Sequence, residues 1–452
     1  MTRISALASH TPTSVRHHIG GTRASEIYQR LLQQYEDTAN SLDVSFRELV
    51  GPLPANDQSH SVAPYPGRLL RHIPRFLLDC EQLVGPDTVV LDPFCGSGTV
   101  LVEARAARLV SWGIDQNPFA RLLAKVKTTP LQESVAAEAT RMVLDRAKAS
   151  RRGEVPDVVN IDLWYSGAIK SRLARLRRAI VEANAEKEVI AYLLVCLALT
   201  ADRCSFRDPR IPVPVRRRDW QILIDCRRPS FVWETFESVA YSVAKKLGTL
   251  RLNTIATFVH GDDARHAAET YSKDLARKLR RPSLILTSPP YGAAQKYIRS
   301  SSLALGWTGL ATADNLPLLE RGCIGREHLR ENEQSLEAPS QSIAVWIEAV
   351  ALRDRLRAAI YAEYFRTMDR ALRNFSEVLA PGGHLVLIAG SNSVAGDTIP
   401  THAYLRDLAL TYGFTAELEL RDTIRGRVLL TKRASKSPPL NYETVHVLRK
   451  GD

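Results

Sequence analysis

Residues 88–115 predict a strand, a tight turn, a helix and a second strand in immediate succession. The first strand is the apolar run TVVLD (88–92), which ends in an acid and leads into a turn that contains two glycines. The helix is TVLVEARAARL (99–109), and the second strand is VSWGID (110–115). A strand, a helix and a strand within about thirty residues form a βαβ unit, whose strands lie parallel in one sheet. We therefore expect an α/β fold.

The alternation of strands and helices is interrupted after this unit and then resumes. Apolar residues at helical spacing between 169 and 180, and the apolar run 188–201, predict helices, so we interpret residues 128–250 as a mostly helical insertion. Further strands are expected at 254–262, 283–290 and 383–390, and an antiparallel pair at 415–420 and 443–448 would close the sheet.

The chain is basic, with 61 Lys and Arg residues against 49 Asp and Glu and a formal charge of +12. This excess favours a polyanionic partner, because Lys and Arg that neutralise phosphates release counterions. The six cysteines are scattered, without a CxxC pair or zinc-like spacing, which is typical of a reducing compartment and predicts no metal site. We see no secretory signal and no apolar run of membrane-spanning length, so we expect a cytoplasmic protein that avoids membranes.

The segment LDPFCGSGTVLVEA (91–104) carries the first candidate site. It places Asp92 at the end of a strand and Gly96 and Gly98 in the turn that follows. Glycines allow a tight turn without interference from Cβ, so a ligand can approach the backbone beside the next helix. The segment lacks the Gly-Lys-Ser/Thr of a phosphate-binding loop and the third glycine of the dinucleotide fingerprint, and by itself it fits several nucleotide-binding folds.

Asp115 ends the next strand, 19 residues after Gly96. A carboxylate in this position can accept hydrogen bonds from both hydroxyls of a ribose. The alternative is that Asp115 caps the helix that starts near Asn117 and Pro118. The glycine turn upstream favours the ligand role.

The segment TSPPY (287–291) is the most specific feature of the chain. Its two prolines, directly after a strand, fix a rigid turn at the carboxyl edge of the sheet, where open α/β sheets bind ligands. Ser288 adds a hydroxyl and Tyr291 an aromatic face. An ordinary loop with a packed tyrosine is the alternative interpretation.

Together these motifs resemble the DNA amino-methyltransferases, whose cofactor motif is similar to DPFCGSGT and whose catalytic motif is (D/N/S)PPY. The segments PYPGRLLRHIPRFLL (64–78), GDDARH (261–266), ERGCIGREHLR (320–330) and YETVHVLRK (442–450) also look like the family. The resemblance implies a class I (Rossmann-like) methyltransferase sheet that binds S-adenosylmethionine. The cofactor-binding residues that it implies are Pro66, Asp92, Phe94, Gly96, Gly98, Thr99, Asp115 and Asp263, the last favoured over Asp262.

The family resemblance also implies a mechanism. The exocyclic amino group of a base is a poor nucleophile, and acceptors at Ser288 and the carbonyl of Pro289 would localise its lone pair. Pro290 completes the motif, and Tyr291 would stack on a target base that is flipped out of duplex DNA. Transfer would be direct and in line, with positioning and electrostatics supplied by the protein.

Several substrates stay open. Ser in the first motif position is typical of enzymes that modify N4 of cytosine, whereas Asp is typical of N6-adenine enzymes, so we expect N4-cytosine with N6-adenine as the alternative. Methylation at cytosine C5 uses a Pro-Cys nucleophile, which the sequence lacks. An RNA base methyltransferase and a DNA-binding protein without activity are the remaining alternatives.

DNA contact is expected in one of two regions. Residues 203–228 hold eight arginines and three aspartates, and among them we single out Arg216, Arg217 and Arg218, because arginine binds phosphate as a fork and reads guanine edges. Arg–Asp pairs or a solvated basic face are the alternative for this segment. The second region is the polar stretch 311–350.

We find no nuclease or helicase motif and expect a stand-alone modification enzyme that is solitary, paired with a restriction enzyme or part of a defence system.

Two insertions in one α/β core explain the 452 residues better than three independent domains. The expected divisions are an N-terminal extension (1–60), the cofactor-binding half of the core (61–127), the helical insertion (128–250), a core segment with the catalytic motif (251–310), a candidate recognition loop (311–350) and the C-terminal part of the core (351–452).

Overall fold

The computed structural model describes residues 21–53, 59–226, 228, 230–250, 255–292, 296–394, 397–423 and 442–452. Parts of the expected N-terminal extension (1–20 and 54–58) therefore lie outside the described residues, as does residue 227 of the basic segment.

Eight strands form one mixed sheet in the order β1-β9-β10-β6-β5-β2-β3-β4. Their bounds are β1 (Leu42–Val44), β2 (Val89–Asp92), β3 (Val110–Gly113), β4 (Thr257–Val259), β5 (Leu284–Thr287), β6 (His384–Ala389), β9 (Phe414–Thr423) and β10 (Tyr442–Lys450). Strands β4, β3, β2, β5 and β6 are parallel, and β10 lies antiparallel between β6 and β9. This order and the antiparallel β10 confirm the class I methyltransferase sheet.

One strand of the eight-stranded sheet was not predicted. β1 pairs in parallel with β9 through Leu42 and Leu420, so the sheet extends one strand beyond the antiparallel pair. A separate two-stranded sheet is formed by β7 (Asn392–Val394) and β8 (Asp397–Ile399).

Helices cover both faces of the sheet because its central strands bury side chains on both sides. In β2, Val89 and Leu91 pack on one face and Val90 on the other. The first face is covered by α12 (Ala267–Thr270), the π-helix η3 (Tyr271–Leu275), α16 (Gln341–Ala351), α17 (Arg355–Val378) and α18 (Thr401–Leu410). The second face is covered by α1 (Gly21–Thr38), α2 (Phe46–Val50), α3 (His72–Leu78) and α4 (Thr99–Ala106). Two-sided burial is typical of parallel strands and explains their continuous apolar sequences.

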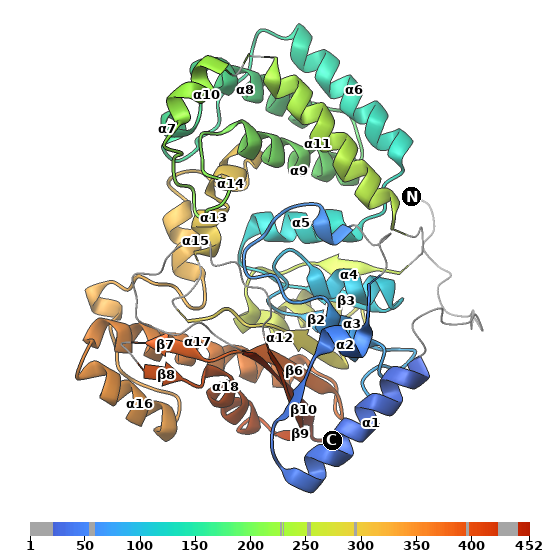
Figure 1. Ribbon diagram of the computed structural model, residues 1–452, viewed down its shortest axis with the longest axis vertical. Coiled ribbons are helices and arrows are strands. Elements are labelled where there is room, and N and C mark those ends of the chain that lie inside the picture. The colour runs from blue at the N-terminus through green and yellow to red at the C-terminus, as the bar shows by residue number, and fades with distance from the viewer. Residues whose placement is uncertain are drawn as a thin grey trace.

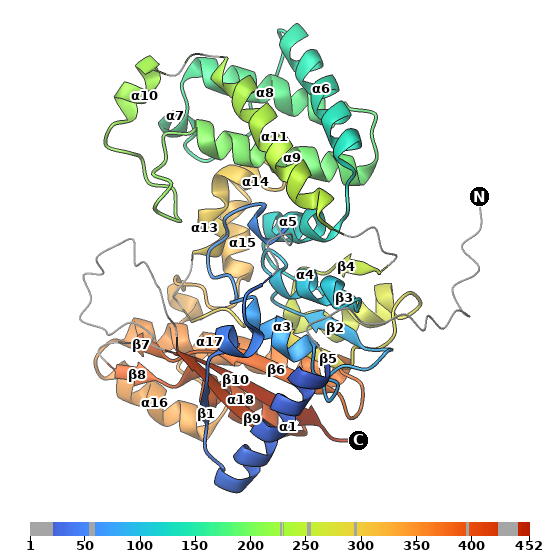
Figure 2. The ribbon, with the colours of Figure 1, turned by 45° about the vertical axis from the view of Figure 1, so that its right-hand side comes forward.

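A helical layer lies beyond the edge of the sheet, between β3 and β4 in the sequence (Figures 1 and 2). It consists of α5 (Pro118–Thr128), α6 (Glu133–Ala149), α7 (Ile161–Trp164), α8 (Gly167–Val181), α9 (Lys187–Cys204), α10 (Trp220–Cys226) and α11 (Phe231–Gly248). The residues at helical spacing in α8, such as Ile169 and Leu173, are buried in its core. Two later helices join this layer to the sheet, α13 (Tyr297–Ser300) and α14 (Ser302–Thr308), and α15 (Leu316–Gly322) follows them.

The sheet also fixes where a ligand can bind. From β2 the chain continues to β3 and β4 on one side, and then crosses to β5 on the other side of β2. The carboxyl ends of β2 and β5 therefore flank a topological switch point, the place where open α/β sheets bind ligands.

Candidate active site

A cavity with an empty volume of about 890 Å³ lies at this switch point. Its wall is built from the segment after η1 (Ser59–Ser61), the carboxyl ends of β2, β3 and β5, the loop after β4, and the residues around α13 and α15. Eight of the predicted residues line it: Asp92, Phe94, Gly96, Thr99, Asp115, Asp263, Ser288 and Pro290. Pro66, Gly98, Pro289 and Tyr291 are not among its described lining residues, although each is next to one in the sequence.

The glycine turn between β2 and α4 needs both of its glycines, for different reasons. Gly96 and Gly98 have φ angles of +49° and +84°, which side-chain-bearing residues rarely adopt. A Cβ atom on Gly96 would lie 3.4 Å from the ring of Tyr65, in the cavity wall. A Cβ atom on Gly98 would lie 3.0 Å from the Cα of Ala124, so Gly98 lets α5 pack against the start of α4.

Asp92 is buried where β2 meets the turn. Its Oδ1 accepts hydrogen bonds from Thr287 Oγ1 at 2.7 Å and from the amide of Phe94 at 3.2 Å. Burial raises the pKa of this carboxyl to about 7, although both hydrogen bonds act in the opposite direction. Thr287 ends β5, so this contact joins the two strands that flank the switch point.

Asp115 holds the glycine turn in place. Its Oδ2 accepts the amide of Gly96 at 2.8 Å, and its Oδ1 accepts the amide of Asn117 at 2.8 Å. The cap of α5 is Asn117, whose side chain accepts the amide of Phe119 at 3.0 Å. Burial raises the pKa of Asp115, and the two backbone hydrogen bonds oppose that rise. A carboxylate has about four lone-pair sites, so Asp115 keeps capacity for further donors.

Asn117 is a buried residue of the site that sequence reasoning missed. Its Nδ2 donates to Ser301 Oγ at 3.0 Å and to Tyr65 Oη at 3.3 Å, and lies 3.4 Å from the carbonyl oxygen of Tyr297. Tyr65 and Tyr297 both line the cavity. One amide therefore ties together three segments of the cavity wall. The Asn-Pro dipeptide at a helix start was a signal for the cap, but not for these distant contacts.

Ser97 and Lys127 form a second contact that the sequence did not reveal. Ser97 lines the cavity, and its Oγ lies 3.0 Å from Nζ of Lys127 in α5. Lys127 is only 1% exposed, and burial lowers its pKa to about 7. A lysine in the last turn of a helix is common, so Lys127 gives no sequence signal of this kind.

The predicted catalytic motif begins where β5 ends at Thr287. Ser288 and Pro290 face the cavity, whereas Tyr291 Oη donates to Glu443 Oε1 of β10 at 3.3 Å. Gly325 packs against the backbone here, because a Cβ atom on it would lie 2.9 Å from the carbonyl oxygen of Tyr291. The segment after α15 therefore rests directly on the motif.

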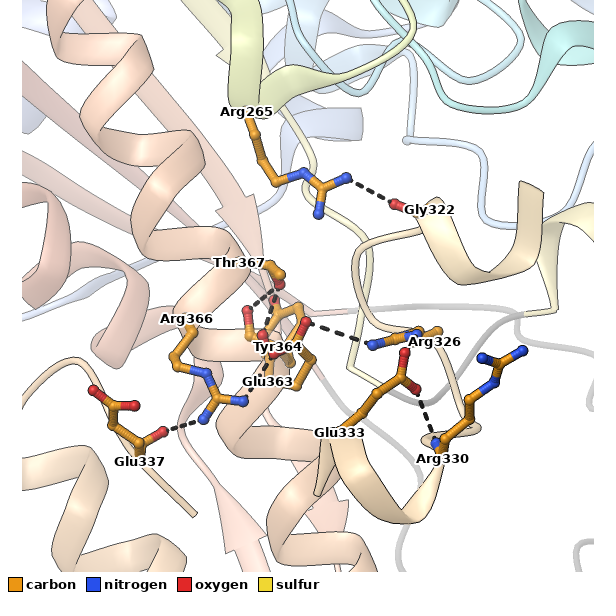
Figure 3. A network of polar contacts seen from close by, with 10 residues as sticks. All are labelled: Arg265, Gly322, Arg326, Arg330, Glu333, Glu337, Glu363, Tyr364, Arg366 and Thr367. Carbon is orange, nitrogen blue, oxygen red and sulfur yellow. Dashed lines mark hydrogen bonds and ion pairs between the residues drawn. The ribbon is translucent and has the colours of Figure 1, made fainter. Parts of the chain in front are cut away.

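Asp263 lines the cavity but already has a strong partner. Its carboxylate forms an ion pair with Arg265, with Oδ2 2.6 Å from Nη2. That arginine also donates from Nη2 to the carbonyl oxygen of Gly322 at 3.1 Å (Figure 3). Asp263 thus links the loop after β4 to the end of α15.

The predicted DNA-binding arginines lie in the turn between α9 and α10, in the helical layer and away from the cavity lining. Arg216 stacks on the ring of Trp220 at 4.4 Å, and Arg217 forms an ion pair with Asp219 at 2.7 Å. Arg218 is exposed. Two further arginines of this segment, Arg207 and Arg210, also form Arg–Asp pairs, with Asp202 and Asp208. Part of the positive charge of the segment is therefore internally balanced.

Cys95 lies inside the glycine turn as a packed side chain. It is 4% exposed, and burial raises the pKa of its thiol well above the usual range. A protonated thiol is a weak nucleophile.

Within the described residues, no cluster of three or more His, Cys, Asp or Glu side chains could hold a metal ion, and no helix has the length and apolarity to cross a membrane.

Several known proteins are similar to this chain. Residues 65–181 match the model of the UPF0020 family, described as an RMKL-like methyltransferase domain. The Type II methyltransferase M.MvaI of Kocuria varians is 21% identical over 386 residues, which are 78% of this chain and 81% of that protein. M.MjaII of Methanocaldococcus jannaschii, also a Type II methyltransferase, is 35% identical over 86 residues, 19% of this chain and 15% of that protein. Among solved structures, the rRNA methyltransferase aviRa from Streptomyces viridochromogenes has a TM-score of 0.32 and 11% identity, and the alignment covers 90% of this chain and 96% of that one.

Proposed function

We propose that this chain, which carries a methyltransferase domain in residues 65–181, transfers a methyl group from S-adenosylmethionine to the exocyclic amino group of a base in DNA. One observation carries the proposal. A single cavity brings the glycine turn and Asp115 together with Ser288 and Pro290, so a cofactor site and a catalytic motif share one space.

The charged residues that line the cavity fit S-adenosylmethionine. Four carboxyl groups and one arginine are among its lining residues, which suits a cationic sulfonium and a ribose with two donor hydroxyls. Gly96 has no side chain, so a ligand can approach its backbone closely. A Cβ atom at this position would instead contact the ring of Tyr65 in the cavity wall.

The family resemblance implies how the cofactor would lie in this cavity. Asp115 would accept the ribose hydroxyls, and Asp263 with Phe94 would hold the adenine side. The turn from Asp92 to Thr99, together with the Pro66 segment, would hold the methionine side. When bound, S-adenosylmethionine supplies an electrophilic methyl group.

The residues of this chain would activate the other reactant. Ser288 Oγ and the carbonyl oxygen of Pro289 would accept hydrogen bonds from the amino group of the base, which concentrates its lone pair on nitrogen. The rigid Pro289-Pro290 turn at the end of β5 would keep these acceptors at a fixed distance from the cofactor cavity. A base can reach them only outside the helical stack, so the target nucleotide would be flipped, with Tyr291 as its stacking surface.

Cytosine N4 is the amino group that we propose, because serine occupies the first position of the motif. Adenine N6 is the alternative. The similarity to Type II methyltransferases supports DNA as the substrate and a role in modification beside a restriction enzyme.

The identity of the product tests the proposal directly. We expect that purified protein, incubated with labelled S-adenosylmethionine and unmodified genomic DNA, yields N4-methyldeoxycytidine when the DNA is digested to nucleosides and analysed by mass spectrometry. Ser288→Ala should lower the transfer rate about tenfold, the value of one hydrogen bond of about 1–1.5 kcal/mol, and leave cofactor affinity intact.

A matched control is Ser272→Ala, an exposed serine whose hydroxyl donates to the carbonyl of Ala268 within its own helical segment. It should leave the transfer rate unchanged. N6-methyldeoxyadenosine would overturn the choice of base but keep the mechanism. Transfer to RNA and not to DNA would overturn the DNA proposal.

The turn between α9 and α10 is proposed to contact the DNA backbone through Arg216, Arg217 and Arg218. We expect the triple replacement by glutamate to weaken duplex binding and to make the dependence of log affinity on log salt shallower by about two, because Arg217 is already paired with Asp219. A salt titration of duplex binding measures this slope. Arg141→Glu on the exposed face of α6 is the control, and an equal slope in wild type and triple variant would exclude this turn from the DNA contact.

A further inference from the structure

A second cavity adjoins the first and shares part of its wall. It has an empty volume of about 970 Å³ and lies between α13, α15 and the segment 323–333. Tyr297, Cys323 and Ile324 line both cavities. Because Gly325 rests on the carbonyl oxygen of Tyr291, the second cavity also borders the catalytic motif.

The segment that walls this cavity is held rigidly. Arg265 binds the carbonyl oxygen of Gly322, and Arg326 forms ion pairs with Glu333 at 3.2 Å and with Glu363 of α17 at 3.7 Å (Figure 3). The segment includes the 3₁₀ turn η4 (Glu331–Glu333), which is anchored because the carboxylate of Glu333 accepts the amide of Arg330 at 2.8 Å. A wall fixed in this way can present side chains to a ligand without first ordering a loop.

The charges that line the cavity are unequal. Five basic side chains face three acidic ones, and the lining set consists of Lys296, Arg299, Arg321, Arg326 and Arg330 against Glu320, Glu327 and Glu333. Two of the acidic side chains form ion pairs with basic side chains of the same lining: Glu327 pairs with Lys296 at 3.2 Å, and Glu333 pairs with Arg326.

Three arginines of the lining take no part in these ion pairs. Within the described part of the chain, no ion pair joins Arg299, Arg321 or Arg330, and all three are exposed. Of the three acidic residues in the lining, only Glu320 takes no part in the two ion pairs described above. The cavity mouth is therefore positive and suited to an anion with several oxygen atoms.

We propose that this second cavity binds the phosphodiester backbone of the substrate strand beside the target nucleotide, through Arg321, Arg330 and Arg299. The inference rests on the proposed function. A DNA strand whose target base enters the first cavity must run past the second cavity. A positive, rigid surface there would hold the DNA backbone while the base is out of the stack. Arginine gives bidentate contacts to phosphate, so these contacts would position the strand without reading its sequence.

The test compares the double variant Arg321→Gln/Arg330→Gln with wild type. The measured quantity is kcat/KM for unmodified genomic DNA as a function of salt. We expect the double variant to lose at least tenfold in kcat/KM at physiological salt, with a salt dependence that is shallower by about two, one for each lost phosphate contact. The dissociation constant for S-adenosylmethionine should stay at the wild-type value, because neither residue lines the first cavity.

Two further variants identify the cause of the change. Arg321→Lys/Arg330→Lys keeps the charge and should restore most of the salt dependence, which a loss of packing would not. Arg280→Gln is the control, since Arg280 precedes β5 at the opposite edge of the sheet and pairs with Asp87 on the surface. An unchanged salt dependence in an active double variant would overturn this inference alone. A wild-type protein that transfers no methyl group to DNA would overturn the proposed function and this inference with it.

Discussion

Replacing Asp115 by alanine is expected to raise the dissociation constant for S-adenosylmethionine about 100-fold or more. Two hydrogen bonds to a charged acceptor contribute about 1.5–3 kcal/mol each, and those to the ribose hydroxyls would be lost together. The carboxylate also accepts the amides of Gly96 and Asn117, so its removal leaves the glycine turn without its anchor. Isothermal titration calorimetry measures the affinity directly.

Asp115→Asn separates charge from shape. Its carboxamide has one acceptor and one donor group, so it can satisfy the amide of Gly96 or that of Asn117, but not both in the present geometry. We expect an affinity between wild type and alanine. Asp145→Asn on exposed α6 is the control, and a wild-type affinity in Asp115→Ala would remove the ribose role from this residue.

The central strands and the location of the cavity were predictable because their signals are local. The apolar run before Asp92 and the one before Ser288 each form a buried parallel strand, and each motif begins where its strand ends. Carboxyl ends of adjacent parallel strands meet at one edge, so two motifs almost 200 residues apart in the sequence could be assigned to one site.

The rest of the site depends on pairings that no local pattern encodes. Asn117 forms hydrogen bonds with Tyr65 and Ser301, which lie 52 and 184 residues away in the sequence. Lys127 of α5 forms a hydrogen bond with Ser97 in the glycine turn. These contacts depend on how α5 packs over the turn, which is a property of the assembled core. The same applies to β1, whose three residues pair with β9 almost 380 positions later in the chain. A three-residue strand has too short a pattern to be recognised from its sequence.

The basic segment 203–228 shows the limit of composition as evidence. Arginines 207, 210 and 217 are matched by nearby aspartates, as the alternative interpretation held, and Arg216 stacks on Trp220. Charge density in the sequence thus overstated the free charge of this surface. A second positive surface borders the predicted catalytic motif and combines arginines of α13, α15 and the segment after α15. Acidic residues are interspersed in 320–333, so its positive excess becomes visible only when the fold adds Lys296 and Arg299.

Glu103→Ala is expected to lower the free energy of unfolding by about 3–5 kcal/mol, the usual effect of removing one partner of a buried ion pair. Glu103 lies in α4 with a fully buried side chain. Its carboxylate contacts His60 at 2.8 Å, Arg71 at 3.2 Å and Arg75 at 2.8 Å. Alanine would leave these groups buried or half-buried around a cavity. Urea denaturation at neutral pH measures the loss, and Glu103→Gln, which keeps volume and hydrogen-bond capacity, should lose less.

The pH dependence gives an independent check of the same cluster. Burial alone would raise the pKa of Glu103, but the hydrogen bond from His60 and the charges of His60, Arg75 and Arg71 hold it below its usual value. A carboxyl with a depressed pKa in the folded state stabilises the protein above its unfolded pKa of about 4.3, and this contribution is lost as the pH falls through the folded value. We therefore expect the difference in stability between wild type and Glu103→Ala to shrink progressively as the pH falls below about 4.3. A constant difference across this range would mean that lost packing, and not charge, explains the effect.

The same cluster links stability to the cofactor cavity. His60 lies before, and Arg71 and Arg75 lie after, the segment 65–69 that lines the cavity, so Glu103 fixes both ends of that segment to α4. Its removal should therefore weaken cofactor binding even at a temperature where the variant is fully folded. Glu377→Ala, which breaks an exposed ion pair with Arg373 on α17, should change stability by less than about 1 kcal/mol and leave cofactor affinity unaltered. Equal cofactor affinities in wild type and folded Glu103→Ala would show that the segment keeps its position without this anchor.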